Sequence, residues 1–314
     1  MKHILLILSI LLSPQAHAAT LAFITNQGDN SVSVVDIVQH RLLKNIAVGK
    51  APVGVVSAVK RGLVYISNVD SQDISVIDVQ QLRVIDHIAV GGSPVGLALS
   101  PDEKQLFVAD WTADVVHVYD TSTLQRQQRL AVGKAPAGLV VSPDGKTLYV
   151  ANRDDDAVAL IDIASGKRRQ SLAVQKHPFG IALSRNAQWL YVVNVLSNSI
   201  SRIALRQSDF PIQHIRVGEH PYCVAESVDG QYLFVSNTQD DTLSVIDVAQ
   251  GKSIKTIAVG AVPEGVNVDI QSGDVLVANW SSGDLSIIDG ASLLLKKQIK
   301  TGEKSRAFGQ FILQ

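Results

Sequence analysis

The sequence predicts an all-β fold: a seven-bladed β-propeller with four antiparallel strands per blade, closed by pairing of the N- and C-terminal strands in one blade. Two landmarks share one period. The first ends runs such as LYVAN and occurs at Asn26, Asn68, Asp110, Asn152, Asn194, Asn237 and Asn279. The second is a proline position, filled by Pro52, Pro94, Pro136, Pro178, Pro221, Pro263 and, in the last copy, Ser305. In both series successive copies lie 42 or 43 residues apart, which identifies an internal repeat.

Each repeat contains four segments with β-strand character. The middle copy gives GLVVS, a PDG turn, KTLYVAN, a polar RDDD turn, AVALID and then RRQSLAV. Val, Ile and Tyr suit a pleated sheet, and the Asp- and Gly-containing segments between them are typical of turns. Helical repeats would need apolar residues at helical spacing over ten or more positions, which these segments lack. Seven such units arranged radially form a propeller.

The two ends of the chain predict how the ring closes. The first repeat begins in its second strand with TLAFITN, and the last repeat ends with AFGQFILQ. The C-terminal segment should therefore supply the innermost strand that the N-terminal unit lacks. Such closure hides strand edges that would otherwise promote aggregation.

Within the repeats, three positions carry local predictions. The Asp that ends most third strands is expected to cap the outer hairpin through an Asx turn, and Ala204 replaces it in one copy. His117 occupies a strand position that holds Ser or Ala in the other copies, which favours a packing role. The acidic run at 154–156 is interpreted as a solvated turn.

Residues 1–18 are predicted to be a cleaved Sec-type signal peptide. Lys2 precedes an apolar run over 4–12, and AHA at 16–18 suits a cleavage site. The apolar run is too short for a membrane span, which needs about 20 residues. No cysteine follows the cleavage site directly, so a lipoprotein is not expected. Residues 19–314 then form one periplasmic or secreted propeller domain without a transmembrane segment.

Composition narrows the classes of partner. Without Lys2 the chain has 27 basic and 29 acidic side chains, and aromatic residues make up 5% of it. This lacks the basic surface and stacking residues of a nucleic-acid-binding protein. Cys223 is the sole cysteine, which rules out an intrachain disulfide. We expect a monomer whose partner is a small molecule or an envelope protein.

The repeat units resemble a known family. LYVANRDDDAVALID, VYISNVDSQDISVID and LFVSNTQDDTLSVID, each preceded by P-x-G and SPDG or a variant, resemble the YVTN-type β-propeller repeat of about 40 residues. That family includes exported YncE-like proteins and propellers of quinoprotein pathways. A more distant resemblance is to the propellers of amine dehydrogenases and haem-d1-binding domains. The resemblance implies the fold and little about activity, because repeat residues are structural.

Positions at which the copies differ indicate a working face. The residues before and after the proline position are small or aliphatic in the first three copies. The next four copies carry the pairs His177 and Phe179, His220 and Tyr222, Val262 and Glu264, and Lys304 and Arg306. In a propeller, the loop between the second and third strands emerges on the same face, and it adds Trp111, Arg153 and Trp280. We expect all of these except Val262 to face a ligand at the central channel; packing variation is the alternative.

Two functions remain open at this point. The first is a non-catalytic exported protein that binds a small anionic or aromatic ligand, or a partner protein, on this face. The second is a cofactor- or metal-handling component of a periplasmic oxidoreductase system, with a quinone, haem or metal. His177 and His220 are weak metal candidates, because zinc needs three or four ligands and only Cys223 or Glu264 would complete the set. A structural or adhesive envelope protein is a third possibility.

Signatures of catalysis are missing from the sequence. It contains no CxxCH haem attachment site, no HExxH motif, no Gly-rich phosphate loop and no nucleophile elbow. We therefore predict no catalytic residue and no particular cofactor.

Overall fold

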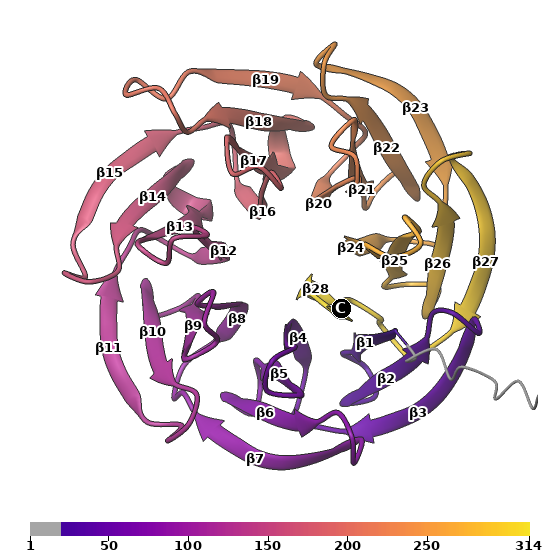
Figure 1. The fold of residues 1–314 in the computed structure, drawn as a ribbon, viewed down its shortest axis with the longest axis horizontal. Coiled ribbons are helices and arrows are strands. Elements are labelled where there is room, and N and C mark those ends of the chain that lie inside the picture. Colours follow the sequence, from indigo (N-terminus) through magenta and orange to yellow (C-terminus); the bar gives the residue numbers. More distant parts are fainter. Residues whose placement is uncertain (1–19) are drawn as a thin grey trace, which may run out of the picture.

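A computed structural model describes residues 20–314, and it confirms the seven-bladed β-propeller. The predicted signal peptide lies outside these residues. Seven sheets stand around a central axis, and the chain visits them in order (Figure 1). Within residues 20–314 the helices are two single 3₁₀ turns, η1 (Arg153–Asp155) and η2 (Val195–Ser197), so none could cross a membrane.

In each blade the strands follow one another from the inside outwards. The first blade contains β29 (Ile312–Leu313), β1 (Leu21–Asn26), β2 (Ser31–Asp36) and β3 (Arg41–Ala47). The second contains β28 (Phe308–Gln310), β4 (Pro52–Ala58), β5 (Leu63–Asn68), β6 (Asp73–Asp78) and β7 (Arg83–Ala89). The third contains β8 (Pro94–Leu99), β9 (Gln105–Asp110), β10 (Val115–Asp120) and β11 (Arg126–Ala131). The fourth and fifth contain β12 (Pro136–Val141), β13 (Thr147–Asn152), β14 (Ala157–Asp162) and β15 (Arg168–Ala173), and then β16 (Pro178–Leu183), β17 (Trp189–Asn194), β18 (Ser199–Ala204) and β19 (Ile212–Arg216). The last two contain β20 (Pro221–Glu226), β21 (Tyr232–Asn237), β22 (Thr242–Asp247) and β23 (Lys252–Ala258), and then β24 (Pro263–Val268), β25 (Val275–Asn279), β26 (Asp284–Asp289) and β27 (Leu294–Lys300).

The core lies between adjacent sheets. Second and third strands such as β13 and β14 are buried along almost their whole length, whereas the outermost strand β15 is exposed except at one position. This explains the sequence pattern, because strands covered on both faces are apolar throughout rather than alternating. The innermost strands approach each other closely, and a Cβ on Gly54 would lie 2.1 Å from the Val95 carbonyl oxygen. The glycine of P-x-G therefore permits the tight ring around the channel.

The two ends of the chain close the ring, as the sequence predicts. In the antiparallel pair β29–β1, Leu21 lies opposite Leu313 and Ala22 opposite Ile312. The backbone N–H of Phe23 also donates to the Phe311 carbonyl at 2.8 Å. The closing segment thus completes the first blade with the strand that it would otherwise lack.

A second pairing of the closing segment was not predicted. Strand β28 runs parallel to β4 of the second blade, with Phe308 opposite Gly54. Gly309 has a φ of +123°, a conformation that side chains other than glycine rarely adopt. The Asn267 side chain donates to the Gly309 carbonyl at 3.0 Å and accepts from the Phe311 N–H at 3.1 Å. The closing segment is therefore hydrogen-bonded to the first, second and seventh blades.

Asx turns cap most outer hairpins. The Asp120 carboxylate accepts hydrogen bonds from the backbone N–H groups of Ser122 and Thr123 at 2.8 and 2.9 Å. Hydrogen bonds from these two residues lower the pKa of Asp120 to about 2. Ala204 cannot form this cap, and the loop after it runs over 205–211 before β19 begins. The altered hairpin predicted for this blade is confirmed.

One blade replaces a recurring polar pair. In five blades the landmark Asn donates to a Ser seven residues later, as Asn279 does to Ser286 at 2.9 Å. The third blade holds Asp110 and His117 instead, with 3.2 Å between Asp110 Oδ2 and His117 Nε2 and both side chains buried. The packing role predicted for His117 is confirmed. Among the described residues, His117 Nδ1 has no hydrogen-bond partner.

Restoring the recurring pair is expected to reduce the loss of stability in acid. Burial lowers the pKa of His117, so the unfolded chain binds a proton more readily than the folded protein. Native stability should therefore fall as the pH drops below about 6.5. We expect the melting temperature to fall less between pH 7.5 and pH 5.5 in the Asp110→Asn/His117→Ser variant than in the wild type. An equal fall in both proteins would contradict this assignment.

Candidate binding site at the mouth of the central channel

Two loop types meet on one face of the ring, as predicted. The N–H of Trp111 donates to the Ser93 carbonyl at 2.9 Å, and the N–H of Trp280 donates to that of Val262 at 2.8 Å. In each case a residue after the landmark Asn or Asp contacts the residue before the proline position. Arg153 makes the same contact in the fourth blade. The loops that carry the predicted site residues therefore lie side by side at one mouth of the channel.

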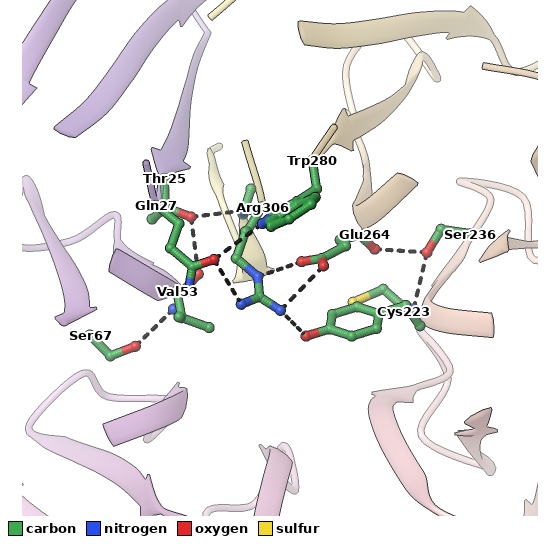
Figure 2. Close-up of polar contacts among 12 residues, drawn as sticks. Thr25, Gln27, Val53, Ser67, Cys223, Ser236, Glu264, Trp280 and Arg306 are labelled. Atoms are coloured by element: carbon green, nitrogen blue, oxygen red, sulfur yellow. Dashed lines mark hydrogen bonds and ion pairs between the residues drawn. The ribbon is translucent and has the colours of Figure 1, made fainter. Parts of the chain in front are cut away.

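A polar network around Arg306 joins three blades at this mouth (Figure 2). Its guanidinium donates to both carboxylate oxygens of Glu264, from Nε at 2.5 Å and from Nη2 at 3.2 Å. Nη2 also donates to the Tyr222 hydroxyl at 2.6 Å, and Nη1 donates to Gln27 Oε1 at 3.4 Å. The Trp280 indole N–H reaches the same Gln27 oxygen at 3.1 Å. The network holds the guanidinium in a fixed orientation.

Burial dominates the electrostatics of this network. It raises the pKa of the Glu264 carboxyl, and the Arg306 guanidinium acts in the opposite direction. Desolvation alone would lower the pKa of Arg306, but Tyr222 and Glu264 reverse this, so its pKa is raised. Burial also raises the pKa values of the Tyr222 hydroxyl and the Cys223 thiol, which keeps both groups protonated near neutral pH. The two-point contact between Arg306 and Glu264 is that of a charge-neutralising ion pair.

Aromatic rings gather beside the network. The ring centroid of Phe179 lies 4.4 Å from that of Tyr222, 4.9 Å from that of Phe308 and 5.9 Å from that of Trp111. These separations and tilted orientations are those that aromatic pairs prefer. Phe179 and Tyr222 thus pack together at the channel mouth, as the packing alternative requires, and they also present an aromatic surface.

A pocket of about 280 Å³ opens between these groups and the opposite side of the channel. It is lined by Gln27, Val53, Val69, Ser93, Val95, Trp111, Phe179, Tyr222 and Arg306. The aliphatic residues of the first copies form one wall, and the aromatic residues with Arg306 form the other. Sequence reasoning placed the ligand on the second wall alone. Four of the ten predicted residues line this pocket, and Glu264 contacts Arg306.

Besides the aliphatic wall, sequence reasoning missed one side chain of the polar network and one of the aromatic group. Gln27 follows the landmark Asn26, the same position that Trp111 and Trp280 hold in their copies, so a comparison of all seven copies could have found it. Phe308 reaches the aromatic group because β28, which follows the last blade in the sequence, pairs with β4 of the second blade. No signal in the repeat indicates that pairing.

Two cations lie over indole rings near the pocket. Lys304 Nζ is 5.2 Å from the ring centroid of Trp280, and Arg153 Cζ is 5.4 Å from that of Trp111. Both distances fall within the range of a cation–π contact. The pocket lining does not include Lys304, Arg153 or Trp280. Each of them contacts a residue that does line it: Arg153 contacts Trp111, and Trp280 and the Lys304 backbone contact Gln27.

The histidine pair takes part in the loop structure. The backbone N–H of His177 donates to Asp156 at 2.8 Å, and that of His220 donates to Asn198 at 3.0 Å. Neither histidine lines the pocket. In the part of the chain that the structure describes, no group of three or more His, Cys, Asp or Glu side chains could hold a metal ion. The suggestion that His177 and His220 bind a metal stays a prediction.

Fold and site together define a seven-bladed β-propeller with an aromatic-lined pocket at one mouth of its channel. The family model described as YNCE-like beta-propeller matches residues 57–141 and 182–273. The chain belongs to this YNCE-like family. A second model, described as Lactonase, 7-bladed beta-propeller, matches residues 120–225. No curated protein matches the chain.

Solved structures show the same fold at low sequence identity. The chain is similar to hydrazine synthase of Kuenenia stuttgartiensis, with a TM-score of 0.77, 20% identity and coverage of 86% of this chain and 92% of the other. It is also similar to a functionally unknown protein from Desulfotomaculum acetoxidans DSM 771, with a TM-score of 0.76, 14% identity and coverage of 93% and 100%. A third similar structure is dihydro-heme d1 dehydrogenase NirN in complex with DHE, with a TM-score of 0.70, 17% identity and coverage of 95% and 76%.

Proposed function

We propose that this protein is an exported, non-catalytic propeller that binds a small aromatic ligand at the mouth of its central channel. The observation that carries the proposal is the pocket between the aliphatic wall and the aromatic wall, with the Arg306 guanidinium at its edge. Small-molecule sites are concave and mostly apolar, with a few fixed polar groups that orient the ligand. This pocket has that composition, and the Arg306 network supplies the fixed polar group.

The chemistry of the walls favours one kind of ligand. Glu264 balances the charge of Arg306, so the wall offers N–H donors without a large excess of positive charge. An arginine side chain has five N–H groups. In Arg306, one of the two N–H groups on Nη1 has no acceptor within residues 20–314. The pocket volume is at the lower end for small-molecule sites. A ligand with one or two aromatic rings and an oxygen acceptor fits these features better than a multiply charged anion.

Substitution of Trp111 tests this proposal. A thermal-shift screen with one- and two-ring aromatic compounds should identify ligands that raise the melting temperature by mass action. For such a ligand, Trp111→Ala should weaken binding about tenfold or more in calorimetry, because one aromatic ring of the pocket wall is lost. Trp189→Ala is the matched control, since Trp189 stacks on Arg202 away from the pocket and should leave the affinity unchanged. The proposal fails if no compound binds, or if both variants weaken binding equally.

A cofactor-handling role is the second candidate. Two similar structures support it: hydrazine synthase and NirN, the latter in complex with DHE. A quinone ring is compatible with the pocket volume, whereas a porphyrin would extend well beyond it. Protein purified from an exporting host would then show a visible absorption band that the Trp111→Ala variant loses, or bound metal that the His177→Ala/His220→Ala variant loses. A featureless spectrum without metal would exclude this candidate in favour of the first.

A further inference from the structure

The outer wall of the propeller carries a surface unlike the rest of its circumference. Strands β23, β27 and β3 are the outermost strands of three successive blades and follow one another along the rim (Figure 1). Each is exposed at every position except one. The Lys255 ammonium donates to the Leu293 carbonyl at 2.8 Å, which links β23 to the adjacent blade.

Large aliphatic side chains are exposed on these three strands. They are Leu42, Leu43, Ile254, Leu294 and Leu295, with exposed fractions from 36% to 62%. On the opposite side of the ring, β11, β15 and β19 expose no large aliphatic side chain to this extent. Single exposed aliphatic residues are normal on protein surfaces, but these five lie on three neighbouring outer strands, and Ile85 on the next outer strand, β7, is exposed as well, which is a pattern that calls for a partner.

The same strands are strongly basic. They contain no Asp or Glu, and their basic residues are Arg41, Lys44, Lys252, Lys255, Lys296, Lys297 and Lys300. Asp274 and Asp289 neutralise part of the charge of Lys296, and Asp284 that of Lys300. Among the described residues, Lys44, Lys255 and Lys297 have no carboxylate partner. These three strands carry seven basic residues and β11, β15 and β19 carry five, in a chain with slightly more acidic than basic residues overall.

Protection of sheet edges explains the basic residues of this surface but not its exposed aliphatic residues. Lysine and arginine on an outer strand prevent pairing with a second molecule, and basic residues on β11 and β15 fit that role. Edge protection gives no reason to place leucine and isoleucine beside the lysines, because exposed aliphatic residues favour association. The combination therefore needs a second explanation.

We propose that β23, β27 and β3 form a docking surface for an anionic lipid membrane, here called the Lys–Leu surface. Lysines next to a bilayer interact with lipid phosphates, and adjacent aliphatic side chains enter the interface between head groups and acyl chains. The strands follow the convex outer wall (Figure 1), and their exposed side chains belong to three separate blades. A fluid lipid surface accommodates that arrangement, whereas an acidic protein would need a concave surface of matching shape. The Lys–Leu surface is separate from the channel-mouth pocket, so this inference does not depend on the proposed ligand.

Vesicle binding by charge-matched variants tests the proposal. The purified protein should cosediment with vesicles containing phosphatidylglycerol and should not cosediment with pure phosphatidylcholine vesicles. Binding should weaken as salt is raised. The Lys44→Gln/Lys255→Gln/Lys297→Gln variant should bind on the order of 100-fold more weakly, since each lysine near the surface contributes about 1 kcal/mol. Arg129→Gln/Arg168→Gln/Arg216→Gln removes the same charge from β11, β15 and β19 and should retain binding.

The contribution of the aliphatic residues needs its own variant. Leu294→Ser/Leu295→Ser keeps every charge and should weaken binding about tenfold or more, because it removes the side chains that enter the interface. All substituted positions are exposed, and unchanged melting temperatures would show that the variants fold. The proposal is overturned if the protein binds neither type of vesicle or binds both types equally. It is also overturned if the two triple variants lose equal affinity for phosphatidylglycerol vesicles. Binding to poly-glutamate without binding to vesicles would indicate an acidic protein partner and would also overturn it.

Discussion

Removal of residues 303–314 is expected to unfold the propeller or to lower its melting temperature severely. The deletion takes away β28 and β29 together with Phe311, which is fully buried in the cluster that contains Phe23 and Ile24. Loss of one buried phenylalanine side chain typically costs about 3–5 kcal/mol. The deletion also removes the hydrogen bonds that Phe23 and Asn267 make with the closing segment. Together these losses are comparable to the whole stability of a typical domain, about 5–15 kcal/mol.

Urea and thermal unfolding with two smaller changes would measure this effect. Phe311→Ala removes one buried ring and should give an intermediate loss of unfolding free energy. Gln314→Ala removes side-chain hydrogen bonds at the half-buried chain end, to Ile270 and Val268, and should cost about 1 kcal/mol. A melting temperature that stays the same after deletion of 303–314 would refute ring closure by this segment.

Substitution of Glu264 alone is expected to destabilise the protein more than substitution of Glu264 and Arg306 together. Glu264→Leu leaves the guanidinium of Arg306 inside the channel mouth without its counterion. Breaking a buried ion pair in this way costs about 3–5 kcal/mol, whereas replacing both partners with apolar groups is often neutral or stabilising. The Glu264→Leu/Arg306→Met variant should therefore recover most of the lost unfolding free energy.

Chemical denaturation of the two single variants and the double variant completes a thermodynamic cycle. Lys304→Met is the matched control, because it removes a cation two residues from Arg306 that forms no ion pair within residues 20–314. That control should change stability by less than about 1 kcal/mol. If the losses in Glu264→Leu and Arg306→Met simply add in the double variant, the two residues are not coupled.

Much of the fold follows from the sequence because the repeat determines it. The landmark Asn donates to a Ser in the same blade, the P-x-G glycine permits close packing around the channel, and Asx turns cap the outer hairpins. The first and third interactions are local to one repeat, and the second joins equivalent positions of adjacent repeats, so seven copies of the pattern predict seven similar blades. The parallel pairing of β28 with β4 depends on contacts between distant blades, and no repeated pattern encodes it.

The candidate site could be predicted only in part. Position in the repeat correctly placed Trp111, Phe179, Tyr222 and Arg306 around one opening. It did not show that Val53 and Val95 form the facing wall, because small aliphatic residues look like scaffold in a sequence. It also did not show that Glu264 and Gln27 occupy most of the hydrogen-bonding capacity of Arg306, since that depends on side-chain directions.

Arg306 belongs to the segment whose hydrogen bonds hold the first and last blades together. A molecule bound to its guanidinium therefore interacts with both the chain terminus and the body of the ring. Occupancy of the pocket would then lower the equilibrium population of molecules with separated terminal blades, and the effect grows with the ratio of ligand concentration to dissociation constant. Resistance of the protein to proteases that attack its C-terminus would report how full the pocket is.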